Sequence, residues 1–261
     1  MKNHQNFSRS ILLIISLIAV GLIFIIGPIK QDLNYHRFAD QRSFFSIQNF
    51  TNVVTNIPFV IIGILGVLKT LRKYRKVIDY QLVALINVFF LGVFLTGIGS
   101  VYYHLNPTNE TLFWDRLPMT ISFMAFFSIV VGEFISVKLG YRFFIPLLIC
   151  GVLSLLYWQV TENSGAGDLR FYVLIQFLPI VLITAILILY KNNNGNVLYY
   201  LVLSIYLLAK LFELNDEFIF STNLIISGHS IKHIIAAAAP LVFLIGLSKR
   251  KPASIIKPLS I

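Results

Sequence analysis

The stretch 80–104, YQLVALINVFFLGVFLTGIGSVYYH, contains no aspartate, glutamate, lysine or arginine in 25 consecutive residues. A helix that crosses a bilayer needs roughly 20 mostly apolar residues, so this stretch is long enough to span a membrane. The whole chain shares this character, because 57% of its 261 residues are hydrophobic and only 12% are charged. A soluble domain carries about twice that share of charge. Most of the protein surface is therefore expected to face lipid.

Seven further apolar runs of similar length flank this stretch, separated by charged or Gly/Asn-rich segments. The sequence thus predicts an all-α fold, a polytopic membrane helix bundle with eight spanning helices. The first run is longer than the core of a signal peptide, and no small-x-small cleavage site follows it, so we expect an uncleaved helix. The predicted spans are 10–28, 52–69, 80–104, 118–137, 141–160, 171–190, 197–215 and 227–248.

The basic residues predict how the helices are oriented. If alternate connections are assigned to one side, 14 of the 21 lysines and arginines fall on that side, which also holds both termini. Because cytoplasmic loops are rich in Lys and Arg, we expect both termini in the cytoplasm. The net charge of +10 then reflects membrane topology, and we expect no binding to nucleic acid.

Three histidines are the strongest candidates for metal ligands. His229 and His233 are four residues apart, a spacing that places both imidazoles on one face of a helix. His104 ends a predicted helix that runs outward, and the other two begin one that runs inward, so all three should meet in the outer half of the membrane. Three histidines and an open position are typical of a catalytic zinc site. The competing interpretation is that each is a hydrogen-bonded packing residue.

Two further polar residues are expected at the same depth. Ser100 lies one turn before His104 on the same helix face, and Asp115 lies at the mouth of the next predicted helix. Zinc lowers the pKa of a bound water to about 7, a carboxylate can accept its proton, and a hydroxyl can donate to a developing oxyanion. Asp115 and Ser100 have the chemistry for these catalytic roles. The alternative for Ser100 is a packing residue, which is common for serine in membrane helices.

Other charged residues near predicted helix ends are better explained as ion pairs that fix helix packing. Lys210 and Glu213 are three residues apart and can pair on one helix face, and Asp168 lies two residues before Arg170. Contact with the headgroup of a substrate is the alternative for this group.

The order and spacing of the candidate residues resemble the motif set of the alkaline ceramidases. This family belongs to a wider superfamily of membrane hydrolases that includes the adiponectin-type receptors. The resemblance covers about residues 34–248. It is carried by Ser100-x-x-x-His104, Asp115, His229-x-x-x-His233 and the segment 47–56, IQNFTNVVTN.

The resemblance implies a seven-helix core preceded by one extra helix. The chain would then divide into an N-terminal tail and extra helix (1–29), a hydrolase core (30–248) and a basic cytoplasmic tail (249–261). The resemblance further implies zinc on the three histidines, with Asp115 activating water and Ser100 donating to the oxyanion. The implied reaction is hydrolysis of the amide of ceramide to a sphingoid base and a fatty acid, with the active site toward the non-cytoplasmic side.

The family also implies a calcium site before the core, where eukaryotic alkaline ceramidases have an acidic segment. Here that region offers Asp32 and Asp40, with Asn49 where the family often has a glutamate. Calcium prefers several oxygen ligands, with carboxylates among them. Asp40 and Asn49 are the candidates, in a site that departs from the family pattern.

Two other classes of function remain open on the sequence. A receptor of the same superfamily would keep the histidines, and a zinc or proton transporter would use them as a relay. Transporters often show broken helices and internal repeats, and the sequence shows neither. The expected partners are a lipid substrate, of the ceramide type or a related acyl amide, and the membrane.

Overall fold

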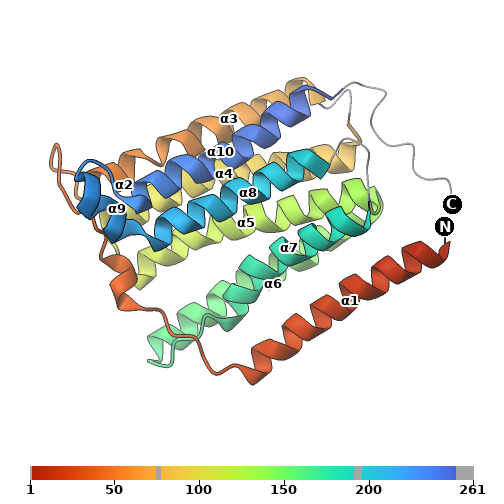
Figure 1. Cartoon of the computed structure of the whole chain (residues 1–261), viewed down its shortest axis with the longest axis horizontal. Helices are drawn as coiled ribbons and strands as arrows, with labels where there is room; N and C mark the ends of the chain where they lie inside the picture. The colour runs from red at the N-terminus through yellow and green to blue at the C-terminus, as the bar shows by residue number, and fades with distance from the viewer. Residues whose placement is uncertain (1, 75–77, 191–195, 251–261) are drawn as a thin grey trace.

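The computed structural model describes residues 2–74, 78–190 and 196–250, which are almost entirely helical and contain no β-strand (Figure 1). The predicted all-α bundle is thereby confirmed. The elements in chain order are α1 (Lys2–Ile25), η1 (Leu33–His36), α2 (Phe50–Val54), α3 (Ile57–Arg72), α4 (Tyr80–Leu105), α5 (Asn109–Phe134), α6 (Val137–Asn163), α7 (Arg170–Leu189), α8 (Asn196–Leu214), α9 (Asp216–Asn223) and α10 (Gly228–Ser248).

Eight segments of the described residues are long and apolar enough to cross a membrane, in agreement with the eight predicted spans. The second of them, Phe50–Arg72, combines α2 and α3. The short helices η1 and α9 lie between spans. Of the predicted basic tail, 251–261 lies outside the described residues, as does Lys191 of the loop before α8.

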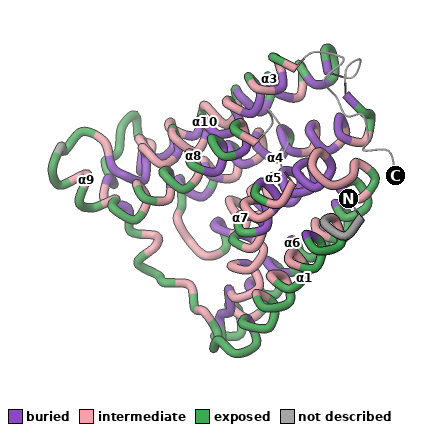
Figure 2. The backbone as a smooth tube through the Cα atoms, turned by 45° about the vertical axis from the view of Figure 1, so that its right-hand side comes forward, coloured by how far each residue is buried: buried purple, intermediate pink, exposed green. Residues whose placement is uncertain are grey.

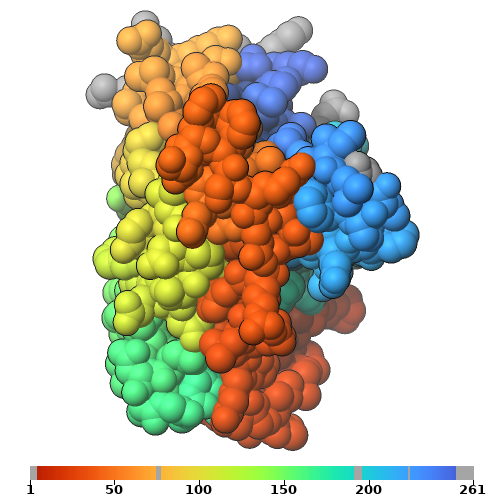
Figure 3. Space-filling view, turned by 90° about the vertical axis from the view of Figure 1, so that its left-hand side faces the viewer, coloured from red at the N-terminus to blue at the C-terminus, as the bar shows by residue number. Residues whose placement is uncertain are grey.

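Successive long helices run in opposite directions along one another, so the bundle has two ends (Figure 1). The start of α1 and the end of α10 lie at one end, here called the inner end. At the other, outer end lie α2, α9 and the loop 26–49, which crosses the end face of the bundle (Figure 3). The two names follow the predicted orientation, which stays a prediction.

Helix α1 lies along α7 at the edge of the bundle, and much of its length is exposed (Figure 2). Its span is the least buried of the eight. Arg170, at the start of α7, donates to the carbonyl oxygens of Ile23 and Ile26 over 3.2 and 2.6 Å. The same guanidinium pairs with Asp168 at 2.8 Å. The predicted ion pair between Asp168 and Arg170 therefore has a structural role, because it fastens the end of α1 to α7.

Helix α5 begins at Asn109 and not at residue 118 as predicted. The hydroxyl of Thr108 accepts a hydrogen bond from the backbone N–H of Thr111 over 3.2 Å and caps the helix. Pro118, the first residue of the predicted span, lies inside the helix. Prolines are tolerated in membrane helices because neighbouring groups satisfy the freed backbone. Asp115 is therefore held within a helix and not at its mouth.

Aromatic rings fill the core of the inner half. Phe90, Tyr199 and Phe243 are fully buried, and the ring of Phe243 lies 6.1 and 6.0 Å from those of Phe90 and Tyr199. Lipid tails are as apolar as these rings, so van der Waals packing holds the helices together here. This packed half fixes the helices whose outer ends carry the candidate site.

Candidate metal centre and adjoining cavity

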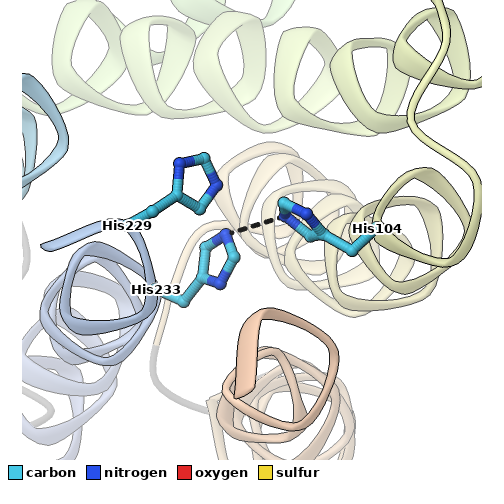
Figure 4. A group of neighbouring side chains, drawn as sticks. All are labelled: His104, His229 and His233. Carbon is cyan, nitrogen blue, oxygen red and sulfur yellow. Dashed lines mark hydrogen bonds between the residues drawn. The ribbon is translucent and has the colours of Figure 1, made fainter. Parts of the chain in front are cut away.

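Three histidines from two helices face one another near the outer end of the bundle (Figure 4). His104 comes from the last turn of α4, and His229 and His233 come from the first two turns of α10. Their ring centroids are 4.9–5.0 Å apart, and one nitrogen of each lies within 4.8 Å of the other two. All three are buried. The structure thus brings together the residues that were expected to converge.

The start of α10 is fixed by contacts that position His229. The hydroxyl of Ser227 caps the helix by accepting a backbone hydrogen bond over 3.2 Å. Asp216 accepts from the backbone N–H of His229 over 2.7 Å. Gly228 packs so closely against the carbonyl oxygen of Phe212 that a Cβ would collide with it. A larger residue there would push α10 away from α8 and displace the histidines.

His233 is oriented through its second ring nitrogen. Its Nδ1 lies 3.0 Å from the hydroxyl oxygen of Thr55, and that hydroxyl donates its own proton to the carbonyl oxygen of Thr51 over 2.7 Å. The Thr55 oxygen is then an acceptor for His233, which places the proton on Nδ1 and leaves the Nε2 lone pair free. This Nε2 faces Nε2 of His104 at 3.2 Å. Thr55 therefore favours the tautomer that a metal ligand needs.

His104 is held through its backbone and by an aromatic ring. Asn49 donates from Nδ2 to the carbonyl oxygen of His104 over 2.9 Å. Phe38, from the loop across the end face, packs its ring 4.6 Å from that of His104 and 4.8 Å from that of His229. Nδ1 of His104 is buried and has no hydrogen-bond partner in the described part of the chain. On its Nδ1 side, packing against Phe38 and not a hydrogen bond therefore orients this imidazole.

His229 contacts a lysine of its own helix. Nζ of Lys232 lies 3.0 Å from Nε2 of His229 and 2.9 Å from Oε1 of Glu213. Glu213 also accepts from Lys210 at 2.6 Å, which is the ion pair expected from the sequence, and from the hydroxyl of Tyr35 at 3.1 Å. An ammonium group only donates, so it occupies the lone pair of Nε2. A metal ion at this nitrogen would displace Lys232, which keeps its bond to Glu213.

A cavity of about 260 Å³ adjoins His233. Its wall includes Ser100, Asp115 and His233, and it continues between apolar side chains such as Phe126 and Ile183. Residues of α4, α5, α7, α8 and α10 all contribute to it. A cavity with a polar end and an apolar remainder suits an amphipathic ligand.

Ser100 and Asp115 face each other across α4 and α5. The hydroxyl of Ser100 and the carboxyl group of Asp115 lie close enough to interact, on the wall of the same cavity. The two helices approach closely because Gly99 packs against the carbonyl oxygen of Trp114, where a Cβ would collide. Pro118 has no N–H to donate to that carbonyl, one helical turn before it. The structure therefore brings both predicted catalytic residues to the wall of one cavity.

The imidazoles fit a metal ion that prefers nitrogen ligands. Two nitrogens that each lie about 2.0–2.1 Å from a tetrahedral ion are about 3.3 Å apart. Nε2 of His104 and Nε2 of His233 are 3.2 Å apart. The three histidines therefore form a buried group that could hold a metal ion.

The two candidates for calcium make other contacts. Arg42 pairs with both carboxylate oxygens of Asp40 at 2.8 Å, and the hydroxyl of Thr51 donates to Oδ2 at 2.6 Å. Arg42 also donates to both carbonyl oxygens of 224–225. The side-chain amide of Asn49 donates to a backbone carbonyl oxygen of α4. Burial raises the pKa of Asp40, but the bonds from Arg42 and Thr51 outweigh it and hold that pKa below its ordinary value. Calcium binding at Asp40 and Asn49 stays a prediction.

Several residues of the site were not singled out from the sequence. Thr55 lies in the polar segment 47–56, whose asparagines and threonines at the start of an apolar span were the available signal. Tyr35 and Phe38 lie in a loop without hydrophobic periodicity, so nothing marked them. Arg116 was counted only as a charge of the outer side, although it lines the cavity.

Comparison with known families adds a finding that does not depend on the geometry. A family model described as Ceramidase matches residues 43–248, which is well over half of the chain. The matched range begins after α1 and ends with α10, and it includes the three histidines. No curated protein shows a significant match to the chain.

Proposed function

The chain belongs to the ceramidase family, and we propose that it is an intramembrane zinc hydrolase that cleaves the amide bond of ceramide-type lipids. The products are a sphingoid base and a fatty acid. The observation that carries the proposal is the buried group of His104, His229 and His233 at the polar end of an apolar cavity.

Zinc is the ion that suits this group best. It takes neutral imidazoles in tetrahedral geometry, and catalytic zinc sites with three protein ligands keep a fourth position open. A bound zinc ion supplies a water of pKa about 7 and polarises the carbonyl oxygen of the substrate. His104, His229 and His233 would hold it, and Thr55 keeps the lone pair of His233 available.

Asp115 and Ser100 supply the proton transfers and the charge stabilisation. The carboxylate of Asp115 takes a proton from the attacking water and delivers it to the leaving amide nitrogen as the C–N bond breaks. The hydroxyl of Ser100 donates to the carbonyl oxygen while that oxygen becomes negative. Both groups line the same cavity, so one substrate amide can reach them together.

The shape of the cavity supports a lipid substrate. The amide would lie at the polar end with Ser100 and Asp115, and an acyl chain would lie among apolar residues such as Phe126 and Ile183. We propose that both termini are cytoplasmic and that the active site opens toward the opposite side. The excess of basic residues on the side of the termini supports this orientation.

The test is to purify the protein in detergent, measure zinc by elemental analysis and follow fatty acid release from ceramide. We expect one zinc per chain and hydrolysis. The variant Asp115→Asn should keep its zinc and lose about 10²–10⁴-fold in rate, the usual contribution of a general base. A matched control is Asp79→Asn, because Asp79 caps α4 at the inner end and asparagine caps equally well.

Two outcomes would replace the proposal. Zinc binding without hydrolysis of any acyl amide would favour a receptor of the same superfamily. Zinc or proton flux through the protein in liposomes would favour a transporter. An Asp115→Asn variant with full activity would remove this residue from the mechanism.

A further inference from the structure

The polar end of the cavity carries more positive than negative charge. Among the described residues that line it, three are cationic: Arg116, Lys210 and Lys232. Two are carboxylates, Asp115 and Glu213. The imbalance exists before any metal ion is counted, and a dication on the histidines would increase it. These three cations, here called the basic cluster, come from three different helices, α5, α8 and α10.

Arg116 is held in place with part of its guanidinium unused. The guanidinium lies over the rings of Trp158, Tyr172 and Tyr35, with its carbon 4.7, 5.0 and 5.8 Å from their centroids. Nη2 donates to Gln31 over 2.7 Å. Nη1 is buried and has no hydrogen-bond partner among the described residues. An unpaired buried N–H of a cation is costly, so a ligand that accepts from it would bind favourably.

Lys210 and Lys232 share one counterion. Both donate to Glu213, at 2.6 and 2.9 Å, and the hydroxyl of Tyr35 takes a further lone pair of the same carboxylate. Each ammonium group has three protons, so one carboxylate leaves donors on both lysines. The side chains of the two lysines are mostly buried, at 30% and 16% exposed. One lysine is enough to neutralise Glu213 in an ion pair. The second lysine therefore adds a net positive charge to the site.

The excess positive charge in this lipid-embedded cavity favours the binding of an anion. Interactions between charges are much stronger there than in water, and a neutral ceramide headgroup offers only hydroxyls. A phosphate or sulfonate close to the amide would accept from the basic cluster while the amide carbonyl lies at Ser100.

We propose that the basic cluster binds an anionic headgroup, so that the substrates of this protein are N-acyl lipids with a phosphate or sulfonate near the amide. This inference rests on the proposed function, because it names the substrate class of the same site. The positions of Arg116 and Lys210 make them specificity-determining residues, which contact the headgroup and not the scissile bond.

The test compares two lipids that differ in one group, N-hexadecanoyl sphingosine (a ceramide) and its 1-phosphate. Hydrolysis of both is measured in neutral detergent, and kcat/KM should favour the phosphate by at least about tenfold. Binding is measured on Ser100→Ala, which changes no charge in the cavity, and the dissociation constants should show the same preference. Binding keeps the inference testable even if neither lipid is hydrolysed.

Lys210→Gln and Arg116→Gln are the informative variants. Each removes a charged donor, and a charge-assisted hydrogen bond is worth about tenfold to a hundredfold in binding. Each should lower the ratio of phosphate to neutral lipid by about that factor. Arg37→Gln is the control, because Arg37 is exposed on the same outer side. If the phosphate lipid were attracted to the protein surface, this variant would lower the ratio too. If the lipid binds the basic cluster, the variant leaves the ratio unchanged.

The outcomes separate the two proposals. Hydrolysis of ceramide with no preference for the phosphate would overturn the anionic headgroup and keep the amidase. Preferential binding of the phosphate without hydrolysis would keep the headgroup site and overturn the amidase. If free hexadecanoate competes as strongly as the phosphate lipid and Lys210→Gln weakens only hexadecanoate, the cluster holds the product carboxylate and the headgroup proposal is wrong.

Discussion

The outer and inner halves of the same bundle are stabilised in different ways. At the outer end, buried polar side chains from distant segments bond to one another, as Ser230 does to Asn52 over 2.6 Å. In the inner half, the buried hydroxyl of Thr70 bonds to its own helix, at the carbonyl oxygen of Gly66 over 2.7 Å, and contacts between distant segments, such as the ion pair of Arg250 with Glu133, lie at the far end from the histidines. Aromatic and aliphatic side chains fill the remaining space.

The difference indicates which half carries function. Polar side chains within a membrane are costly and are usually functional, and a hydroxyl bonded to its own helix avoids that cost without a neighbour. Bonds between distant segments instead fix side chains relative to one another. A scaffold does not need that precision, whereas a metal site does. The inner half is therefore the scaffold, and the outer end is the site.

The comparison predicts its largest effect for a metal ligand. His233→Ala should lose the bound zinc and at least about a thousandfold in hydrolysis, because the ion that activates water is gone. Phe243→Ala in the inner half should do the opposite. It should keep one zinc per chain but lower the free energy of unfolding by about 3–5 kcal/mol, as for other buried phenylalanines.

Elemental analysis and thermal unfolding in detergent check this pair. Zinc loss in Phe243→Ala with the fold intact would show that the two halves are not separate in function.

The second effect concerns Ser100. Ser100→Ala should lose about 10²–10³-fold in kcat, as expected for one oxyanion donor, with zinc content and unfolding temperature unchanged. Ser128→Ala is the matched control, because Ser128 is equally buried but lies farther along α5 in the inner half. Steady-state kinetics on ceramide measure both. Equal losses for the two serines would assign the effect to helix packing.

The third effect concerns the residue that orients His233. Thr55→Val removes the acceptor of Nδ1 and should weaken zinc binding by about 10–100-fold, the usual effect of losing such a partner. Thr70→Val makes the same chemical change on the same membrane span but at its inner part. Competition with a chelator gives both affinities. If Thr70→Val weakens zinc as much as Thr55→Val, the bond to His233 is not the cause.

The sequence predicts the membrane spans better than it predicts the helix starts and the loop at the outer end. The spans follow from hydropathy, and the meeting of His104 with α10 follows because the third span ends on the side where the eighth begins. The start of α5 differs from the predicted start at residue 118, because the cap at Thr108 begins the helix among polar residues that hydropathy does not count as part of a span.

The loop across the outer end face was the least predictable region. Its path depends on tertiary contacts, such as the bond from the backbone of Ala39 to Asp216 over 3.0 Å. That contact joins segments that are far apart in the sequence, so it leaves no pattern in the local sequence. Phe38 and Tyr35 reach the site only because the loop is held in this way, so the hydrophobic periodicity of the sequence could not identify them as site residues.

The smallest effect is a pH dependence in this loop. Arg42 and Thr51 hold the pKa of Asp40 below its ordinary value, against the burial that raises it. The pair therefore stabilises the loop fully above about pH 4, the pKa of an unfolded aspartate, and this stabilisation is lost as pH falls through the lower native pKa. Because Arg42 is half exposed, the contribution should be no more than about 1 kcal/mol.

Hydrogen exchange of the amides in 39–52 checks this dependence, after correction for the intrinsic effect of pH. Asp40→Asn should abolish the change below pH 4. A change of the same size in that variant would place the titrating group elsewhere.

The most direct test of the metal centre is to remove the metal with a chelator and to titrate zinc back into the protein. Hydrolysis of the preferred acyl amide should be absent without zinc, rise in proportion to added zinc and stop rising at one equivalent per chain, and His104→Ala should not recover. Full hydrolysis by the metal-free protein, or recovery in His104→Ala, would contradict the account.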